Sequence, residues 1–226
     1  MTSHPPSQRQ IFLAGEGDAW YQRNQQISPQ NINQYNASDP LLDLLEGLPL
    51  PDGINTFVLE VGCGQGLRLQ QLQQQRGWSI AGLDPSAAAI GALSEESGIK
   101  AIVGTADLLP FPDQSVDLLI YGFCLYLCDR NDLFRIASEA HRVLKPNSWL
   151  AILDFWAPSL RINPYHHKDG VYSYKADLPA MFTWHPAYVI TDHLLRHHGS
   201  RDYTDNPNEW VAATLLRRSD SLLAAA

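Results

Sequence analysis

The clearest pattern in the chain is a series of short apolar runs separated by segments with helical periodicity. The runs cover residues 57–61, 79–83, 100–104, 116–121 and 148–155. Between the last two runs, apolar residues recur at spacings of three and four along residues 132–144, which predicts a helix with one apolar face. We expect Asp129 or Asn131 to cap the start of this helix. Pro146 should stop it, and Asn147 should adopt a left-handed conformation.

This alternation of strand and helix predicts parallel strands joined by right-handed crossovers. The apolar runs are nearly continuous, as expected for strands that are covered on both faces. Two further strands are expected near residues 188–190 and 210–216. The pattern therefore predicts an α/β fold, a three-layer αβα sandwich with a seven-stranded, mainly parallel sheet.

The first 50 residues carry a less regular pattern. Residues 1–15 are predicted to form a loose arm, and residues 15–26 a short amphipathic piece. A connector rich in Gln and Asn follows, and "DPLLDLLEGLPLP" predicts a helix that ends near Gly47.

The first apolar run leads into a glycine-rich turn, "EVGCGQG", and then into a helical pattern. Such a turn between strand and helix is typical of nucleotide binding. A dinucleotide fingerprint has the spacing G-x-G-x-x-G, but here the glycines are Gly62, Gly64 and Gly66, and Leu67 stands where the third should fall. Glu60 lies at the mouth of the turn, where its carboxylate would oppose a diphosphate. The pattern favours a phosphate-free, cationic ligand, as S-adenosylmethionine is.

Two more carboxylates follow successive strands. Asp84 ends the second strand, where a carboxylate can accept both ribose hydroxyls. Asp107 lies just past the third strand, where it could accept from an adenine amino group. The structural alternatives are a helix cap for Asp84 and a turn residue for Asp107.

The motifs "EVGCGQG", "GLDPS", "GTADLLPFPDQSVDLL" and "HRVLKPNSWLAILDF" together resemble class I S-adenosylmethionine-dependent methyltransferases of the methyltransferase type 11 group, which act on small molecules and include quinone-biosynthesis enzymes. The resemblance covers residues 57–155 and implies a Rossmann-like fold whose seventh, antiparallel strand is "EWVAATLLRR". It departs from the family at Asn147, where a glycine is usual. It implies a cofactor held as follows: the amino-acid part over Gly62, Cys63, Gly64 and Gly66 with Glu60 nearby, ribose on Asp84, adenine near Pro85 and between Ala106 and Leu108 beside Asp107, and the methyl group facing the end of the fourth strand near Tyr121.

We therefore divide one domain, residues 1–226, into three parts. Residues 1–50 form an N-terminal arm and lid helices, and residues 57–155 form the cofactor-binding core. Residues 156–226 form a substrate-side insertion and the closing strands.

Methyl transfer depends mainly on proximity and orientation, and a base is needed chiefly when the acceptor is a hydroxyl. The candidate catalytic residues are His166 and His167, since histidine changes charge near neutral pH, and Tyr121. The alternative for both histidines is a solvated loop. Tyr165, Tyr172 and Tyr174 either form a stacking wall for the acceptor or pack a lid.

The N-terminal stretch "GEGDAWYQRN" has two interpretations. Trp20, Tyr21 and Arg23 could close over the cofactor, with Arg23 pairing the methionine carboxylate. Alternatively, the stretch is an amphipathic helix packed on the sheet edge. His193, His197 and His198 offer an i, i+4 pair for a metal on a helix, but no glutamate lies between them and we expect no metal site.

Composition limits the function classes. A formal net charge of −8 over 226 residues argues against a nucleic-acid partner. The three cysteines lack CxxC spacing, which fits a reducing compartment. No apolar run is long enough to cross a bilayer and the start lacks a signal-peptide core, so we expect a cytoplasmic protein without a membrane partner. A monomer or a homodimer is equally compatible.

The sequence thus predicts an enzyme that methylates a small molecule, a sugar, a quinone or another metabolite, at oxygen or nitrogen. An S-adenosylmethionine-binding protein without transferase activity is the first alternative. A nicotinamide-dependent oxidoreductase is the second.

Overall fold

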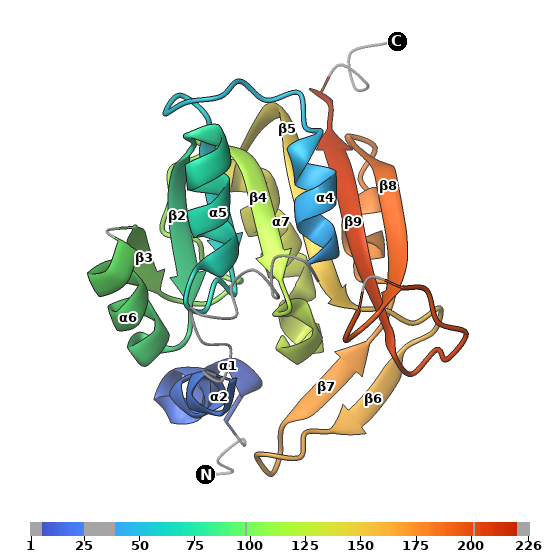
Figure 1. The fold of residues 1–226 in the computed structure, drawn as a ribbon. Helices are drawn as coiled ribbons and strands as arrows, with labels where there is room; N and C mark the ends of the chain where they lie inside the picture. The colour runs from blue at the N-terminus through green and yellow to red at the C-terminus, as the bar shows by residue number, and fades with distance from the viewer. Residues whose placement is uncertain (1–5, 25–38, 98, 201, 221–226) are drawn as a thin grey trace.

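The computed structural model describes residues 6–24, 39–97, 99–200 and 202–220. Seven strands form one sheet in the order β3-β2-β1-β4-β5-β9-β8 (Figure 1). Their bounds are β1 Phe57–Val61, β2 Ser79–Asp84, β3 Lys100–Val103, β4 Val116–Gly122, β5 Leu144–Phe155, β8 Tyr188–His197 and β9 Trp210–Arg218. Only β9 among them runs antiparallel to its neighbours. The predicted seven-stranded, mainly parallel sheet is confirmed.

Helices cover both faces of the sheet (Figure 1). Three helices share one apolar cluster with the sheet: α4 (Pro40–Glu46), α5 (Leu67–Arg76) and α6 (Ala87–Ser97). The opposite face is covered by α7 (Leu133–Val143) and by the short α8 (Ala180–Thr183). The arrangement is the predicted three-layer αβα sandwich.

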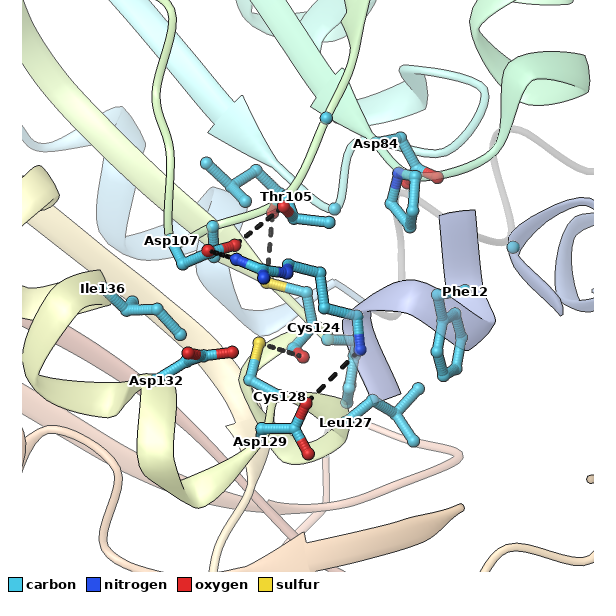
Figure 2. A pocket seen from close by; sticks show the side chains of 18 of the residues that line it. Phe12, Asp84, Thr105, Asp107, Cys124, Leu127, Cys128, Asp129, Asp132 and Ile136 are labelled. Atoms are coloured by element: carbon cyan, nitrogen blue, oxygen red, sulfur yellow. Dashed lines mark hydrogen bonds and ion pairs between the residues drawn. The ribbon is translucent and has the colours of Figure 1, made fainter. Parts of the chain in front are cut away.

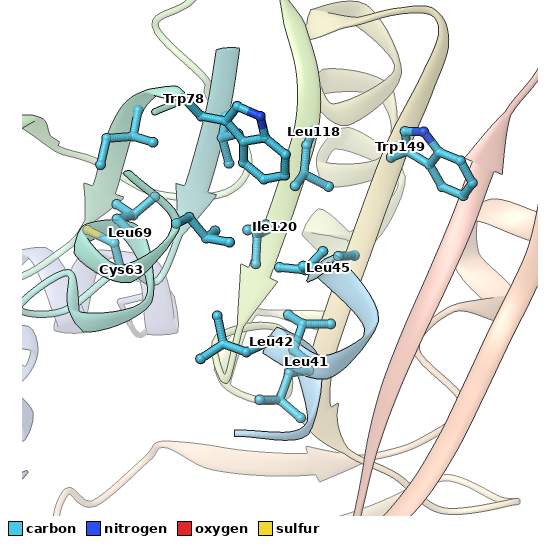
Figure 3. Close-up of a cluster of buried hydrophobic side chains, with 14 of the residues drawn as sticks. Leu41, Leu42, Leu45, Cys63, Leu69, Trp78, Leu118, Ile120 and Trp149 are labelled. Atoms are coloured by element: carbon cyan, nitrogen blue, oxygen red, sulfur yellow. The ribbon is translucent and has the colours of Figure 1, made fainter. Parts of the chain in front are cut away.

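Alternating side chains of the central strands supply both clusters. On β4, Leu118 and Ile120 belong to the first cluster, whereas Leu119 and Tyr121 belong to the second. Figure 3 shows Leu118 and Ile120 facing the leucines of α4 and α5. This two-residue periodicity is the reason that the strand is apolar throughout.

The helix predicted over residues 132–144 is confirmed as α7, with corrections at its ends. Its N-cap is Asp132, whose side chain forms no capping hydrogen bond, so the expected caps Asp129 and Asn131 are wrong. A 3₁₀ turn, Arg130–Asp132, precedes the helix. Asn131 lies within this turn, and Asp129 lies at its N-cap. Asn147 has the expected left-handed conformation, with φ of 57°, but it lies inside β5.

The N-terminal segment differs from the prediction. Instead of a loose arm, the described residues before Gly17 form α1 (Gln8–Ile11) and a π-helical turn, Phe12–Glu16. Gln8 is buried because its amide donates to the Leu127 and Tyr172 carbonyl oxygens, at 2.7 and 3.1 Å. These bonds join segments more than a hundred residues apart, which no local pattern reveals.

The next helix, α2 (Gly17–Asn24), matches the amphipathic piece expected over residues 15–26. Together with α1 it lies beyond the carboxyl ends of β1–β3 (Figure 1). The Gln- and Asn-rich connector, residues 25–38, is outside the described residues. The helix predicted to end near Gly47 is confirmed as α4, which has Asp39 as its N-cap.

Beyond β5 the chain forms a hairpin of β6 (Arg161–Pro164) and β7 (Tyr172–Lys175), at the same end of the molecule as α1 and α2 (Figure 1). His193 and His197 lie on strand β8, so the expected helical pair is wrong. Within the described ranges, no His, Cys, Asp and Glu side chains cluster as a metal site. None of the described helices has the length and apolar character needed to span a bilayer.

Candidate cofactor and acceptor site

The glycine turn joins β1 to α5 in a conformation that requires glycine. Gly62, Gly64 and Gly66 have φ of 77°, 51° and 69°, values that cost other residues about 1–2 kcal/mol. A Cβ on Gly62 would lie 2.7 Å from the Cys124 Cβ, and one on Gly66 would lie 2.4 Å from a Leu93 methyl group. A Cβ on Gly64 would meet nothing within 4 Å. The turn is therefore packed tightly at its two ends and open in the middle.

Asp84 binds both the glycine turn and the next helix. Its Oδ2 accepts a hydrogen bond from the Gly64 amide, and its Oδ1 accepts one from the Ser86 amide, each at 2.9 Å. Burial raises the pKa of the carboxyl group. Asp84 therefore caps the next helix, and it also lines the narrow pocket. The structure is compatible with both expected roles, helix cap and ribose acceptor.

Glu60 lies deeper than the sequence suggests. Its side chain is buried and forms an ion pair with Arg68, which also donates to Asp39 at 2.8 Å. Burial raises the pKa of Glu60 to about 7, despite the guanidinium. Oε2 of Glu60 accepts no hydrogen bond from the described residues. An acceptor atom that is buried and unpartnered beside a pocket is a place for a ligand donor.

Arg68 and Asp39 were missed by sequence reasoning. Arg68 lies one turn into α5 and looks like a surface residue of a polar helix, but its side chain is 3% exposed. Asp39 precedes α4, far from the glycine turn in sequence. Only the packing of α4 against α5 brings these two side chains to Glu60.

Asp107 lies just past β3 as expected, and its carboxylate already has three partners: Thr105, Arg9 and, at 3.9 Å, Arg135. The Thr105 hydroxyl donates to its Oδ1 at 2.7 Å, and the Arg9 guanidinium of α1 pairs with its Oδ2. Figure 2 shows Asp107 beside Thr105, with Asp129 and Asp132 on the other side of the pocket. Arg9 therefore covers the carboxylate that was expected to receive the adenine amino group. Arg9 was not predicted as a site residue, because it lies in the segment that was expected to be a loose arm.

Two pockets meet at this edge of the sheet. The narrow pocket has a volume of about 110 Å³ and is lined by Asp84, Pro85, Ala106 and Asp107. The wide pocket has a volume of about 650 Å³ and is lined by Glu60, Cys63 and Gly64, within the range of ~300–1,000 Å³ usual for ligand sites. Both pockets share four residues, Trp20, Gly62, Gly122 and Phe123.

The predicted cofactor residues thus fall on one continuous space, with three exceptions, Gly66, Leu108 and Tyr121. Leu108 is 70% exposed and lines neither pocket, although its neighbours Ala106 and Asp107 do. Gly66 is turned toward Leu93 and serves the packing of the turn. The remaining predicted residues divide between the narrow and the wide pocket.

The three catalytic candidates differ in whether they line a pocket. Tyr121 is fully buried in the second apolar cluster, stacked on Phe182 at 6.2 Å, and lines neither pocket. The Tyr121 side chain is therefore not placed to act as a catalytic group, because side chains alternate along β4 and Tyr121 points to the α7 face. The end of β4 itself lies at the site, since Gly122 lines both pockets. His166 is exposed and lines neither pocket, whereas His167 lines the wide one.

The segment around α2 lines the wide pocket with Trp20, Tyr21 and Arg23. Arg23 is not free: it pairs with the buried Glu16 and donates to the Tyr165 hydroxyl at 3.0 Å. The Arg23 contact therefore ties the N-terminal segment to the hairpin loop across the pocket. Its pairing with a methionine carboxylate stays a prediction.

The three tyrosines of the hairpin region have different surroundings. Tyr165 lines the wide pocket and is half-buried. Tyr172 is 42% exposed, and the Tyr174 ring lies under the Arg130 guanidinium at 4.2 Å. Only Tyr165 is placed as a wall of the site, and the other two pack the hairpin.

Two residues that line the wide pocket were not predicted as ligand-binding residues. Phe123 is a non-glycine residue with φ of 47° at the end of β4, a strained conformation of the kind that concentrates at functional sites. His198 lies just after β8, with its ring 4.8 Å from that of Phe155 and 5.9 Å from that of Phe123. Their sequence neighbours resemble ordinary loop residues, so only the fold reveals these positions.

The residues present fit a cationic adenosine ligand. Glu60 Oε2 is an unpartnered buried acceptor, and the space over Gly64 is open. Carboxylates prevail around the turn, because Asp39, Glu60 and Asp84 are opposed by Arg68, and Arg23 is already paired with Glu16. An ammonium group suits this surface, and a diphosphate does not.

Comparisons with known proteins agree with this arrangement. Residues 59–152 match a family model described as a methyltransferase domain. A malonyl-[acyl-carrier protein] O-methyltransferase of Coxiella burnetii is 38% identical over 50% of this chain and 37% of its own length. An uncharacterized methyltransferase of Synechocystis sp. is 34% identical over 51% of this chain and 53% of its own length. The chain thus spans 37% and 53% of the length of these two relatives.

Solved structures share the fold at low identity. An S-adenosylmethionine-dependent methyltransferase of Methanosarcina mazei superposes with a TM-score of 0.62 and 18% identity, over 78% of this chain and 97% of that one. The [4+2]-cyclase SpnF superposes with a TM-score of 0.64 and 16% identity, over 96% of this chain and 98% of that one. At this identity the likeness concerns the fold alone.

Proposed function

We propose that the chain, whose residues 59–152 match a methyltransferase domain, transfers a methyl group from S-adenosylmethionine to a small-molecule acceptor, at oxygen or nitrogen. One observation carries the proposal. Glu60 Oε2, the open middle of the glycine turn at Gly64 and the Asp84 carboxylate line one space where two pockets meet. That set suits an ammonium group, a thioether backbone and a ribose in succession.

The two pockets divide the cofactor between them. The narrow pocket, with Pro85 and Ala106, would hold the adenine, and Asp84 at its edge would accept the ribose hydroxyls. The wide pocket would hold the amino-acid part over Cys63 and Gly64 and leave room for an acceptor. When bound, the cofactor supplies an electrophilic methyl group on a sulfonium.

The contribution of the chain is orientation and exclusion of water. Trp20 and Phe123 line both pockets, so they lie where the cofactor and the acceptor would meet. Asp154 fixes the neighbouring loop, because its buried carboxylate accepts from the Leu125 and Tyr126 amides at 2.9 and 3.2 Å. Holding two reactants in line accounts for much of the acceleration in such a displacement.

The first alternative is an S-adenosylmethionine-binding protein without transferase activity. A protein named as a [4+2]-cyclase shares this fold, so the fold by itself does not specify transferase activity. A nicotinamide cofactor is disfavoured by Glu60, whose carboxylate would oppose the diphosphate above the turn.

Isothermal titration calorimetry separates these possibilities. We expect S-adenosylhomocysteine to bind with a dissociation constant of about 10 µM or lower, the concentration range in which small-molecule cofactors usually bind enzymes. Reduced nicotinamide cofactor should give no binding heat. Binding of the nicotinamide cofactor alone would overturn the proposal. Binding of S-adenosylhomocysteine without transfer to any acceptor of a broad panel would favour the non-catalytic alternative.

A further inference from the structure

We call the part of the wide pocket that is lined by Trp20, Tyr165 and His198 its acceptor half. His198 has no role in the proposed cofactor site. His198 follows β8, and its backbone amide donates to the Glu209 carbonyl at 2.8 Å, which anchors it between β8 and β9. Its ring packs on Phe155 and touches the edge of Phe123, with centroid distances of 4.8 and 5.9 Å. Phe123 lines both pockets, so His198 lies directly behind the place where they join.

The ring of His198 packs against aromatic rings, but its nitrogens form no hydrogen bond with the described residues. The neighbouring His197, by contrast, accepts from the Gly199 amide through Nδ1 at 2.9 Å. The aromatic packing fixes the ring plane and leaves its nitrogens for the pocket. Both His198 and His167 are exposed to solvent, but the His198 ring packs against two phenylalanine rings, whereas the His167 ring contacts the Tyr165 ring at 5.3 Å.

The charge around His198 favours its neutral form. Burial lowers its pKa, and Lys175 and His197 act in the same direction, while Glu209 opposes them. Lys175 Nζ lies over the Phe155 ring, 4.7 Å from its centroid. A neutral imidazole near pH 7 is able to accept a proton.

The walls of this half are aromatic. Tyr126 meets the Phe155 ring edge-on at 5.0 Å, and Trp20, Phe123 and Tyr165 also line the wide pocket, together with the aliphatic Leu153 and Val211. Flat aromatic walls select a flat acceptor, since ring faces stack or pack edge-to-face at such distances.

We propose that His198 is the general base for a planar acceptor that carries an acidic hydroxyl, such as a phenol or an enol. This rests on the proposed function and narrows it to oxygen methylation. The hydroxyl proton passes to a ring nitrogen of His198, the oxygen lone pair forms the bond to the methyl carbon, and the carbon–sulfur electron pair returns to sulfur. The imidazolium then releases its proton to solvent, so no oxidant or reductant is needed.

The test uses 4-nitrophenol, whose phenolate absorbs visible light and whose neutral form does not. With the protein saturated by S-adenosylhomocysteine, we expect bound 4-nitrophenol to ionise at lower pH in the wild type than in His198→Gln. With saturating S-adenosylmethionine near pH 7, kcat/KM for 4-methylphenol, whose hydroxyl stays neutral in free solution, should fall about 10²–10⁴-fold in His198→Gln, the usual range for loss of a general base.

Matched controls make each outcome decisive. His166→Gln changes an exposed histidine outside both pockets and should behave as the wild type. The affinity for S-adenosylhomocysteine should be unchanged in His198→Gln, which separates failure of this inference from failure of cofactor binding. His198→Asn serves in its place if the glutamine variant does not fold. Unchanged ionisation and transfer in the variant, or transfer to 4-nitroaniline but not to 4-nitrophenol, would overturn the inference. So would absence of 4-nitrophenol binding to a protein that binds S-adenosylhomocysteine.

Discussion

The narrow and the wide pocket lie side by side but are assembled in different ways. The narrow one is built mainly from residues that directly follow successive parallel strands, such as Asp84 after β2 and Ala106 after β3. The acceptor half of the wide one combines Trp20, Tyr165 and His198, which come from distant parts of the chain. Adjacent strand ends follow from topology, whereas distant loops meet only through packing. The two pockets should therefore respond differently to substitution.

The largest effect is expected at the glycine turn, where two glycines with similar φ differ in their surroundings. Gly62→Ala places a Cβ 2.7 Å from the Cys124 Cβ and 2.8 Å from the Gly122 oxygen. We expect the free energy of unfolding to fall by about 2–5 kcal/mol from backbone strain and overpacking. Denaturant unfolding measures it.

Gly64→Ala is the matched control, because its Cβ would project into open space. It should lower the free energy of unfolding by only about 1–2 kcal/mol, the cost of the left-handed conformation. It should nevertheless weaken S-adenosylhomocysteine binding, since the new methyl group fills the space proposed for the ligand. Equal losses of stability in the two variants would contradict the difference between them.

Asp84→Asn tests the charged end of the narrow pocket. Replacing two charge-assisted hydrogen bonds to ribose by neutral ones should weaken S-adenosylhomocysteine binding about 100-fold, or ~2.7 kcal/mol. Calorimetry with Asp117→Asn provides the control. Asp117 also accepts from a backbone amide, that of Phe57 at 2.8 Å, and from Lys145, but it lies at the amino end of the sheet. A similar loss of affinity in both variants would mean that Asp84 acts only on the fold.

Glu60 should make cofactor binding depend on pH. Its pKa is raised to about 7 by burial, so its ionised fraction rises from about one-tenth at pH 6 to about nine-tenths at pH 8. An ammonium ligand prefers the ionised form, and its affinity should rise about tenfold over this interval. Calorimetry at pH 6, 7 and 8 measures the trend. If the affinity of the wild type does not change with pH, or if Glu60→Gln shows the same pH dependence, Glu60 does not contribute to cofactor binding.

The stability of the ligand-free protein should show the opposite trend. The folded-state pKa values of Glu60 and Asp154 are both raised to about 7 by burial. The stability linked to their protonated forms is complete below the ordinary carboxyl range and is lost as pH rises through about 7. Thermal unfolding should therefore give a lower Tm at pH 8 than at pH 5.5, and a Tm that increases across this interval would contradict the burial of these charges.

The smallest effect is expected at Arg9. Its guanidinium is about one-third exposed and pairs with Asp107, which is also held by Thr105. Arg9→Gln should free the carboxylate and strengthen S-adenosylhomocysteine binding about two- to fivefold, in keeping with a partly exposed ion pair. Weaker binding in the variant would instead place Arg9 within the bound site as a permanent neighbour of the adenine.

The sequence was informative wherever function follows from strand ends. The order of strands, the glycine turn, Asp84 and Asp107 are all set by the periodicity of the central segment, and the structure places them at one edge. The sequence failed where contacts are non-local. Arg9 and Gln8 lie in a segment with no apolar periodicity, yet polar bonds to distant loops order it.

The misjudged catalytic candidates have equally physical reasons. Tyr121 ends a strand, but one residue of register decides which face a side chain takes, and it faces α7. His166 lies in a histidine-rich loop and points away from both pockets, whereas the less conspicuous His198 is brought in by the antiparallel pairing of β8 with β9. Composition of a loop indicates chemistry, and only packing decides which residue is placed to perform it.

The most direct test of the account is a crystal structure of the complex with S-adenosylhomocysteine. The account predicts both ribose hydroxyls on the Asp84 carboxylate, the ammonium group within hydrogen-bonding distance of Glu60 Oε2, and the adenine beside Pro85 and Ala106. A ribose bound elsewhere, with Glu60 Oε2 still unpartnered and the space over Gly64 still open, would contradict it.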